Sequence, residues 1–449
     1  MRVFYRSIEV EGLETVPTSG PLILAANHPN TLMDVLLVAM MLDRKVGFIA
    51  KATLFENPLA GALLRFLGAV PIHRTQDGAS AAGKAANAQA LAASEEAVAE
   101  GRAILIFPEG VSQDEPRLQR VKTGVARIAL GAERRAPGQV RVVPVGLVYD
   151  DYDTFRSRAR VRFLEPIAVA PFLELAKDPE DFTPVRTLTD AIRDSLREDV
   201  VHVEDESHDH LVAQVDELYG HKAKELAGGR LAVTPVVAQA VNHFAKEDPA
   251  RVERVASQLS AYRGALLAEG VDDATIRGHS QELELADHIL FFGFSLIALW
   301  GALNHLLLYN APRAALRLIP VHRAYHASGK FLVGLLALGV CYGAQGAFVY
   351  WLAAGPLSEL AAGTTPWTPT LIYVGTLPLT GMIALLWFEA YESRRHRARA
   401  AKERRRLGPQ LARLRTLRAA LFAELDAAQA DFLAHLDRLE EGSPAAAPD

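Results

Sequence analysis

The chain contains a single cysteine among its 449 residues, and Cys341 lies inside an apolar stretch. One cysteine excludes an internal disulfide and a cysteine-rich metal site. Positive charge is not in excess either, because the formal net charge is -5. General nucleic-acid binding is therefore not expected, and any basic patch has to be interpreted locally.

The N-terminal residues lack the apolar core of a secretory signal. Polar and apolar side chains alternate over residues 1–13, and the charged ones are Arg2, Arg6, Glu9 and Glu11. We therefore expect the N-terminal half of the chain to remain in the cytoplasm.

Charged side chains are missing from three long stretches in the second half of the chain. Residues 288–312, 331–358 and 360–388 contain no Asp, Glu, Lys or Arg. Each stretch is long enough to supply the roughly 20 mainly apolar residues that a helix needs to cross a bilayer. The pattern predicts a multi-pass membrane protein with its membrane region over residues 287–390.

The loops between these stretches differ in positive charge. Residues 313–330 include several arginines and a lysine, whereas residues 355–370 include none. Positively charged loops remain in the cytoplasm, so we expect 313–330 on the same side as the N-terminal domain. The first apolar stretch must then enter and leave the membrane on one side. We predict a re-entrant or interfacial hairpin over 289–311, bent near Gly301 to His305, and crossing helices over 331–354 and 369–388.

The remaining segments differ in composition and are expected to be soluble. Residues 1–168 alternate short aliphatic or β-branched runs with helical stretches, which predicts an α/β domain. Residues 169–286 are charged and predict a helical subdomain. The expected strands are 5–10, 22–26, 46–50, 69–73, 103–107, 140–147 and 160–164, and the expected helices in that domain are 32–42, 58–67, 79–100 and 122–135.

The C-terminal segment, 391–441, combines a basic stem with a leucine-rich helix, and 442–449 is expected to be disordered. The stem begins with Arg394 and Arg395. Beside a membrane exit, such a cluster is expected to contact anionic lipid headgroups, and a solvated helical stem is the alternative. The leucines that follow at spacings of three and four predict an amphipathic helix, either a coiled coil or a lid on the helical subdomain. Self-association through this helix is a further expectation.

A histidine and a carboxylate follow the expected strand 22–26. His28 comes two residues after it and Asp34 six residues later. A neutral imidazole takes a proton from a hydroxyl only when its other ring nitrogen is held as a donor, and a nearby carboxylate does this. The pair is therefore a candidate general base with its orienting carboxylate. Lone histidines are more often structural, so the assignment depends on neighbouring blocks.

Three further blocks lie at the ends of expected strands. Gly68–Arg74 ends in an arginine placed to hold a phosphate through bidentate hydrogen bonds. In Phe107–Ser112, Gly110 lets backbone amides approach a ligand and Glu109 can accept from a hydroxyl. That block lacks the Gly-x-Ser-x-Gly pattern of a nucleophile elbow. The third block, Val143–Leu147, would alone be a buried strand.

Taken in order, the four blocks resemble the signature of the phospholipid/glycerol acyltransferase family, which transfers fatty acyl chains onto glycerol phosphates and lysophospholipids. The resemblance covers residues 5 to 166 and includes Lys122–Leu130, which looks like the family stretch after the Glu-Gly block. It implies a mixed sheet flanked by helices, no cofactor, and acyl-CoA or acyl-ACP as co-substrate.

Two details resemble one branch of this family. Five residues, Pro29 to Met33, separate the histidine from the aspartate, where most of the family has four. Five is usual among glycerol-3-phosphate and dihydroxyacetone-phosphate acyltransferases. Many members also follow Glu-Gly with Thr-Arg, whereas this chain continues Val111-Ser112, and the same branch commonly has a serine there. Lys122 or Arg127 is then the candidate to replace the missing arginine as a phosphate contact.

The resemblance implies direct acyl transfer without an acyl-enzyme. His28 would deprotonate the acceptor hydroxyl as it attacks the thioester, and Asp34 would orient the imidazole. Arg74 and Lys122 would hold the acceptor phosphate, and Glu109 with the next backbone amide would position the glycerol hydroxyls. The expected catalytic residues are His28 and Asp34, and the expected substrate-binding residues are Asn27, Arg74, Glu109, Gly110, Ser112 and Lys122.

Other functions stay open at this stage. Acylation of lysophosphatidate or another lysophospholipid would use the same four blocks. A membrane-anchored lipid-binding scaffold without activity would be expected to have damaged catalytic positions, and these are intact. A soluble hydrolase is disfavoured, because no activated serine or cysteine is evident. The His- and carboxylate-rich tract His202–His210 enforces no three- or four-ligand pattern, so no metal site is expected.

Overall fold

The computed structural model describes residues 1–442 except 2, 67, 73–80, 111–117, 179–180, 200–204, 227–232, 279–284, 319–324 and 360–362. Its contacts divide the chain into two compact units. Met1–Val203 and Val321–Ser328 form the first, which we call the sheet unit. Glu204–Pro320 and Gly329–Asp449 form the second, which we call the helical unit.

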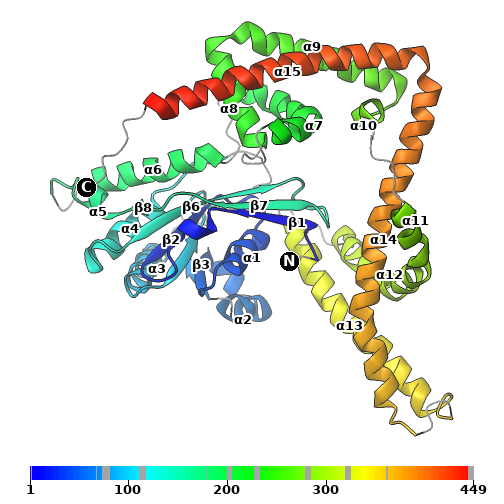
Figure 1. The fold of residues 1–449 in the computed structure, drawn as a ribbon. Coiled ribbons are helices and arrows are strands. Elements are labelled where there is room, and N and C mark those ends of the chain that lie inside the picture. The colour runs from blue at the N-terminus through cyan, green and yellow to red at the C-terminus, as the bar shows by residue number, and fades with distance from the viewer. Residues whose placement is uncertain are drawn as a thin grey trace. The chain divides into compact units, whose positions relative to one another are not determined.

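The described part of the sheet unit contains an eight-stranded mixed sheet in the order β1-β7-β6-β2-β5-β3-β4, with β8 paired to β6 (Figure 1). Strands β2 to β6 are parallel, and β7 and β8 run antiparallel to β6. The predicted α/β fold is confirmed. The strands are β1 (Ser7–Glu11), β2 (Leu22–Ala26), β3 (Val46–Lys51), β4 (Ala69–Ile72), β5 (Ala103–Ile106), β6 (Arg141–Tyr149), β7 (Arg158–Phe163) and β8 (Ile167–Ala168).

Helices cover both faces of this sheet, which explains why its central strands are apolar throughout. Every residue of β2 and β5 is buried, as expected for parallel strands between two helical layers. Figure 1 shows α1 and α6 on opposite faces. The helices of the unit are α1 (Leu32–Met41), α2 (Pro58–Phe66), α3 (Ala81–Ala99), α4 (Gly124–Arg135), α5 (Ala170–Leu173) and α6 (Thr183–Asp199).

Helix α6 belongs to the core of the sheet unit. Leu188, Ile192 and Leu196 are fully buried at four-residue spacing, in the same cluster as Ile23 of β2 and Ile128 of α4. Burial of each such side chain stabilises the fold by about 1.5–3 kcal/mol. The compact unit therefore continues to Val203, past the boundary predicted at residue 168.

The shorter helices of the helical unit pack against its C-terminal helix. The amphipathic face of α15 is buried against α7, α8 and α9, and Arg251 of α9 donates to Asp431 of α15 at 2.8 Å. The leucine pattern therefore forms a lid within the unit, and self-association stays a prediction. The helices are α7 (Asp209–Leu226), α8 (Val233–Glu247), α9 (Pro249–Glu269), α10 (Asp273–Arg277) and α15 (Pro409–Gly442).

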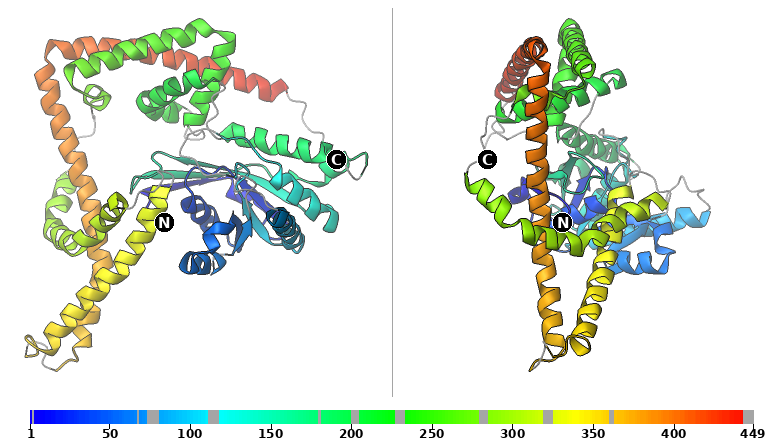
Figure 2. Two further views of the ribbon diagram at one scale, coloured as in Figure 1. Left: turned by 180° about the vertical axis from the view of Figure 1, so that it is seen from behind. Right: turned by 90° about the vertical axis from the view of Figure 1, so that its right-hand side faces the viewer.

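The apolar stretches of the helical unit form long helices. Among the described residues, α13 (His326–Ala354) and α14 (Trp367–Leu407) are long and apolar enough to cross a membrane. The pair α11 (Leu285–Gly293) and α12 (Ser295–Leu318) is bent by 50°, as a broken span or a re-entrant loop. Figure 2 shows α14 as one continuous helix that extends through the predicted basic stem.

The predicted position of the bend is wrong. The chain bends between Gly293 and Ser295, and Gly301 to His305 lie inside the continuous helix α12. Gly301 serves close packing instead, because a Cβ atom there would lie 2.1 Å from the carbonyl oxygen of Thr380 in α14. Small residues allow membrane helices to approach closely in this way.

Polar side chains join the three long apolar helices. His305 of α12 is hydrogen-bonded through Nε2 to the Tyr342 hydroxyl of α13 at 2.9 Å. The Tyr373 hydroxyl of α14 donates to Asn304 of α12 at 2.5 Å. Such bonds satisfy polar groups where water is scarce and fix how the helices pack.

Candidate active site

The candidate catalytic residues lie where parallel strands end. His28 follows β2, Glu109 follows β5, and these two strands are neighbours in the sheet. Because the carboxyl ends of parallel strands meet at one edge, residues far apart in the sequence come together here. Asp34 reaches the same place from the first turn of α1.

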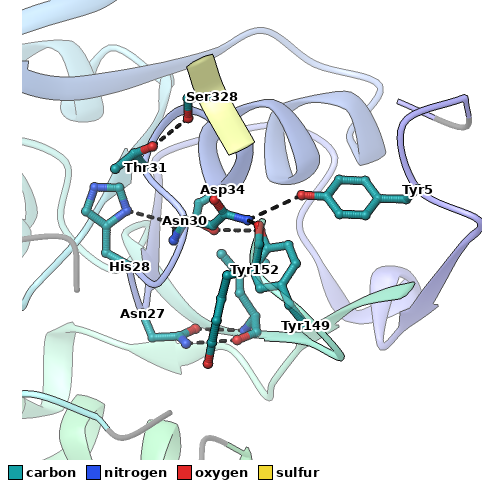
Figure 3. A network of polar contacts seen from close by, with 10 residues as sticks. Tyr5, Asn27, His28, Asn30, Thr31, Asp34, Tyr149, Tyr152 and Ser328 are labelled. Carbon is teal, nitrogen blue, oxygen red and sulfur yellow. Dashed lines mark hydrogen bonds and ion pairs between the residues drawn. The ribbon is translucent and has the colours of Figure 1, made fainter. Parts of the chain in front are cut away.

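His28 and Asp34 form the predicted pair. Nδ1 of His28 lies 2.9 Å from Oδ2 of Asp34 (Figure 3). A carboxylate at this nitrogen favours the tautomer with hydrogen on Nδ1, so Nε2 is free of hydrogen and can accept a proton. The His28 ring stacks on Phe107 at 3.7 Å between centroids and is 14% exposed. The stack fixes the ring plane while one edge stays accessible.

Asp34 is fully buried, and three donors stabilise its charge. Besides His28, the backbone amide of Asn30 donates to Oδ2 at 2.7 Å and the Tyr149 hydroxyl donates to Oδ1 at 2.5 Å. Burial, and then the negative charge of Asp34, raise the pKa of Tyr149 far above its ordinary value. Tyr149 therefore stays protonated and remains a donor at physiological pH.

The loop between the pair is held in a strained conformation. Thr31 has a φ of 45°, which is unfavourable for a β-branched residue and costs on the order of 1–3 kcal/mol. Its hydroxyl is hydrogen-bonded to the hydroxyl of Ser328 at 2.5 Å (Figure 3). Ser328 lies in the first turn of α13 and belongs to the sheet unit. His326, in the same turn, lies 3.3 Å from Asp153.

Glu109 links several parts of the site. It is 5% exposed, and its carboxylate accepts from the backbone amides of His28 and Gln119. Burial raises the pKa of Glu109 to about 7, helped by the charge of Asp34 and opposed by the two amides. A contact of Glu109 with the acceptor stays a prediction.

Gly110 and Lys122 lie side by side. Gly110 has a φ of 70°, which favours glycine, and a Cβ atom there would lie only 2.6 Å from Nζ of Lys122. The backbone amide of Lys122 donates to the carbonyl of Pro108 at 2.9 Å, which fixes this approach. The structure thus places a cation beside the Glu-Gly turn.

The side chain of Asn27 continues the backbone hydrogen bonding of the sheet. Its amide nitrogen donates to the carbonyl of Leu147 at 2.9 Å, and its oxygen accepts from the Leu147 amide at 2.7 Å. These bonds continue the pairing of β2 with β6 past Ala26. They give Asn27 a structural role, and its contact with substrate stays a prediction.

Two predicted site residues fall outside the described part of the chain, namely Arg74 and Ser112. Among the described residues no group of three or more His, Cys, Asp or Glu is placed to hold a metal ion.

Residues 7–148 match the family model described as Acyltransferase. This part of the chain is therefore similar to acyltransferases. It contains all of the site described above except Tyr149, Asp153 and the first turn of α13.

Three relatives have a similar sequence. An uncharacterized acyltransferase of Schizosaccharomyces pombe is 24% identical over 359 residues, 61% of this chain and 53% of that protein. Glycerol-3-phosphate O-acyltransferase 2 of Saccharomyces cerevisiae is 49% identical over 75 residues, 16% of this chain and 10% of that protein. A chloroplastic 1-acyl-sn-glycerol-3-phosphate acyltransferase of Arabidopsis thaliana is 29% identical over 146 residues, 32% of this chain and 36% of that protein. The chain thus spans about half the length of the first relative and less of the others.

Several residues that support the His28–Asp34 pair could not be found from the sequence. Tyr149 contacts Asp34 from 115 residues away, and Ser328 contacts Thr31 from 297 residues away. No local pattern marks such partners. Phe107 did have a sequence signal, because it lies between an apolar run and Pro108-Glu109. In the structure it directly follows β5, the neighbour of β2.

Proposed function

We propose that this protein is a membrane-bound O-acyltransferase that moves a fatty acyl chain from a thioester donor to a hydroxyl of glycerol-3-phosphate, with its sheet unit in the cytoplasm. The observation that carries the proposal is the His28–Asp34 pair. The buried carboxylate of Asp34 accepts three hydrogen bonds, one of them from Nδ1 of His28, so Nε2 of the histidine is the available base.

The chemistry is a direct displacement at the thioester carbonyl. Nε2 of His28 takes the proton of the acceptor hydroxyl as the oxygen forms a bond to the carbonyl carbon. Asp34 stabilises the imidazolium through Nδ1. When the tetrahedral intermediate collapses, the carbon–sulfur bond breaks and the imidazolium returns its proton to the thiolate. The products are the ester and a free thiol, and His28 is again neutral.

Lys122 supports a phosphate-bearing acceptor. It stands beside Gly110 at the edge of the sheet, where an ammonium group attracts a phosphate close to the base. Arg74 is proposed as a second contact from the end of β4. Fixing the acceptor at both its phosphate and its hydroxyl gives the proximity on which transfer without a covalent intermediate depends.

The choice of acceptor is supported by the sequence around the pair. Five residues separate His28 from Asp34, and Ser112 follows the Glu-Gly turn, as in the glycerol-3-phosphate branch. The short stretch that is 49% identical to a yeast glycerol-3-phosphate O-acyltransferase favours the same acceptor. Acylation of 1-acyl-glycerol-3-phosphate is the second candidate, favoured by the likeness to the chloroplastic enzyme.

Thiol release from palmitoyl-CoA by the purified full chain in lipid vesicles tests this proposal. The acceptors are glycerol-3-phosphate, dihydroxyacetone phosphate, lysophosphatidate and lysophosphatidylcholine, and the His28→Ala variant measures background hydrolysis. We expect the highest kcat/KM with glycerol-3-phosphate. A preference for lysophosphatidate would support the second candidate, and no transfer to any acceptor would support an inactive lipid-binding scaffold.

A further inference from the structure

A basic cleft of about 490 Å³ lies in the sheet unit, away from the His28 ring. Residues 118–121 and Thr123 form one wall, and helix α6 with the preceding Phe182 forms the other. Both walls are anchored in the core, because Leu118 and Leu188 belong to one buried cluster. The cleft is therefore a fixed part of the fold.

Arginines dominate the charge of this cleft. Its lining includes Arg120, Arg186, Arg193 and Arg197, against the single carboxylate of Asp190.

The four arginines are not equivalent. Arg193 bonds to Asp190 at 2.5 Å and to the neighbouring Asp194 at 2.9 Å, so its charge is compensated. Arg197 lies 3.9 Å from Asp194. Within the part of the chain that the structure describes, Arg120 and Arg186 form no ion pair. These two guanidinium groups give the cleft its excess positive charge.

The wall of the cleft is bonded to the active-site residues. The backbone amide of Gln119 donates to Glu109, which also accepts from the amide of His28. The backbone amide of Lys122, two residues after Arg120, donates to the carbonyl of Pro108, and the side chain of Lys122 lies against Gly110. A ligand held in the cleft is thus attached to the segment that borders the catalytic histidine.

We infer that this cleft binds the phosphate groups of CoA in the acyl donor, an inference that rests on the proposed transfer reaction. Guanidinium groups hold phosphates by paired, charge-assisted hydrogen bonds. At the rim of the cleft, the side chain of Phe182 is 42% exposed, and the guanidinium of Arg127 lies over its ring at 5.4 Å. These two flat groups offer a surface on which an adenine can stack. The acceptor phosphate is already assigned to Lys122, beside Gly110. The arginines of the cleft are therefore assigned to the phosphates of the donor.

The shape of the site favours CoA over an acyl carrier protein. A concave cleft with arginines on both walls encloses flexible phosphates, whereas the convex acidic surface of a carrier protein needs charges spread over an open face. The donor class is therefore tested directly by removing the phosphates from the donor.

The experiment compares palmitoyl-CoA with palmitoyl-pantetheine, which has the same thioester and no phosphate, in the full chain. In the Arg120→Gln/Arg186→Gln variant we expect the KM for palmitoyl-CoA to rise by about tenfold or more, with kcat nearly unchanged. The kinetics with palmitoyl-pantetheine should not change. The control is Arg102→Gln, an exposed arginine outside the cleft, paired with Glu100.

Calorimetric binding of adenosine 3′,5′-bisphosphate separates this inference from the proposed reaction, because it needs no turnover. Wild-type protein should bind it and the double variant should bind at least tenfold more weakly. Equal binding, or an equal loss of activity with both donors, would overturn the inference. So would a loss that occurs with acyl-ACP and not with palmitoyl-CoA. If binding behaves as expected and no acceptor is acylated, the cleft assignment holds and the proposed function fails.

Discussion

Asp34 is the most constrained side chain of the site. An ionised carboxylate without water is costly, and its charge persists only when several donors surround it. Here the donors come from the loop, the preceding histidine and a tyrosine at the end of β6. The same bonds fix the direction of the carboxylate, and therefore the orientation of the imidazole that it holds.

The His28–Asp34 pair could be predicted from the local sequence, because a histidine and a carboxylate six positions apart on either side of a helix start can come into contact. The environment of Glu109 could not be predicted. Its sequence position suggests a polar residue in an open turn, whereas the folded chain buries it against the backbone amides of His28 and Gln119. Backbone partners carry no residue-specific signal.

The raised pKa of Glu109 predicts a specific pH dependence of stability. Between pH 4.5 and about 7 the unfolded chain releases this proton and the folded chain keeps it. Folding stability should therefore fall as pH rises to about 7 and then level off, by about 3 kcal/mol in total at about 1.4 kcal/mol per pKa unit. The difference in melting temperature between wild type and Glu109→Gln, followed from pH 4.5 to 8, measures this. Parallel curves for the two proteins would show that the carboxyl does not titrate in this range.

At the scale of elements, apolar runs predict strands well when both faces are covered. The predicted strand 22–26 coincides with β2, and the predicted strand 103–107 is one residue longer than β5, because an uninterrupted buried run has sharp ends. The bend before α12 was misplaced for a physical reason. Gly301 signals either a break or a close contact, and only the packing partner Thr380 decides between them.

Ser328 is expected to position the catalytic loop through Thr31. Ser328→Ala removes a hydrogen bond worth about 1 kcal/mol, so kcat should fall by about fivefold with little change in KM. Ser328→Thr keeps the hydroxyl and should restore most of the rate. Steady-state kinetics of the two variants test this. A loss of thermal stability with unchanged kcat in Ser328→Ala would assign the contact a structural role only.

Gly301 is expected to govern the packing of α12 on α14. Gly301→Leu should lower the melting temperature of the detergent-solubilised protein by several degrees, because the side chain meets the backbone of Thr380. The matched control is Gly375→Leu in α14, since nothing lies within 4 Å of a Cβ atom there. If both variants melt alike, close approach of the two helices is not what Gly301 provides.

At the scale of the whole molecule, charge distribution sets the expected membrane arrangement. Helix α14 has 41 residues, about 60 Å at 1.5 Å per residue, so one helix continues from an apolar span into the basic stem. Composition alone predicts both parts, because a membrane excludes charge and positively charged segments stay on its cytoplasmic side. The number of crossings depends on the bent pair α11 and α12, and the positive charge of residues 313–330 predicts that this pair enters and leaves the membrane on the cytoplasmic side.

The topology makes a direct prediction for the C-terminal end of α12. With Cys341 replaced by serine, Ala315→Cys should react with a membrane-impermeant thiol reagent only from the cytoplasmic side. This position follows Arg313, and positive charge keeps such a segment in the cytoplasm. Ser358→Cys, in the segment between α13 and α14, is the control and should react only from the other side. Labelling of Ala315→Cys from the outside would mean that the first apolar stretch crosses the membrane.

The central claim is that His28 is the base and that Asp34 acts through it. The most direct measurement is the kcat for acyl transfer of His28→Ala, Asp34→Asn and the double variant in lipid vesicles. Each single change should reduce kcat by on the order of a hundredfold or more. The double variant should lose no more than His28→Ala, because Asp34 has no role without the imidazole. Full activity in either single variant, or losses that multiply in the double variant, would contradict the account.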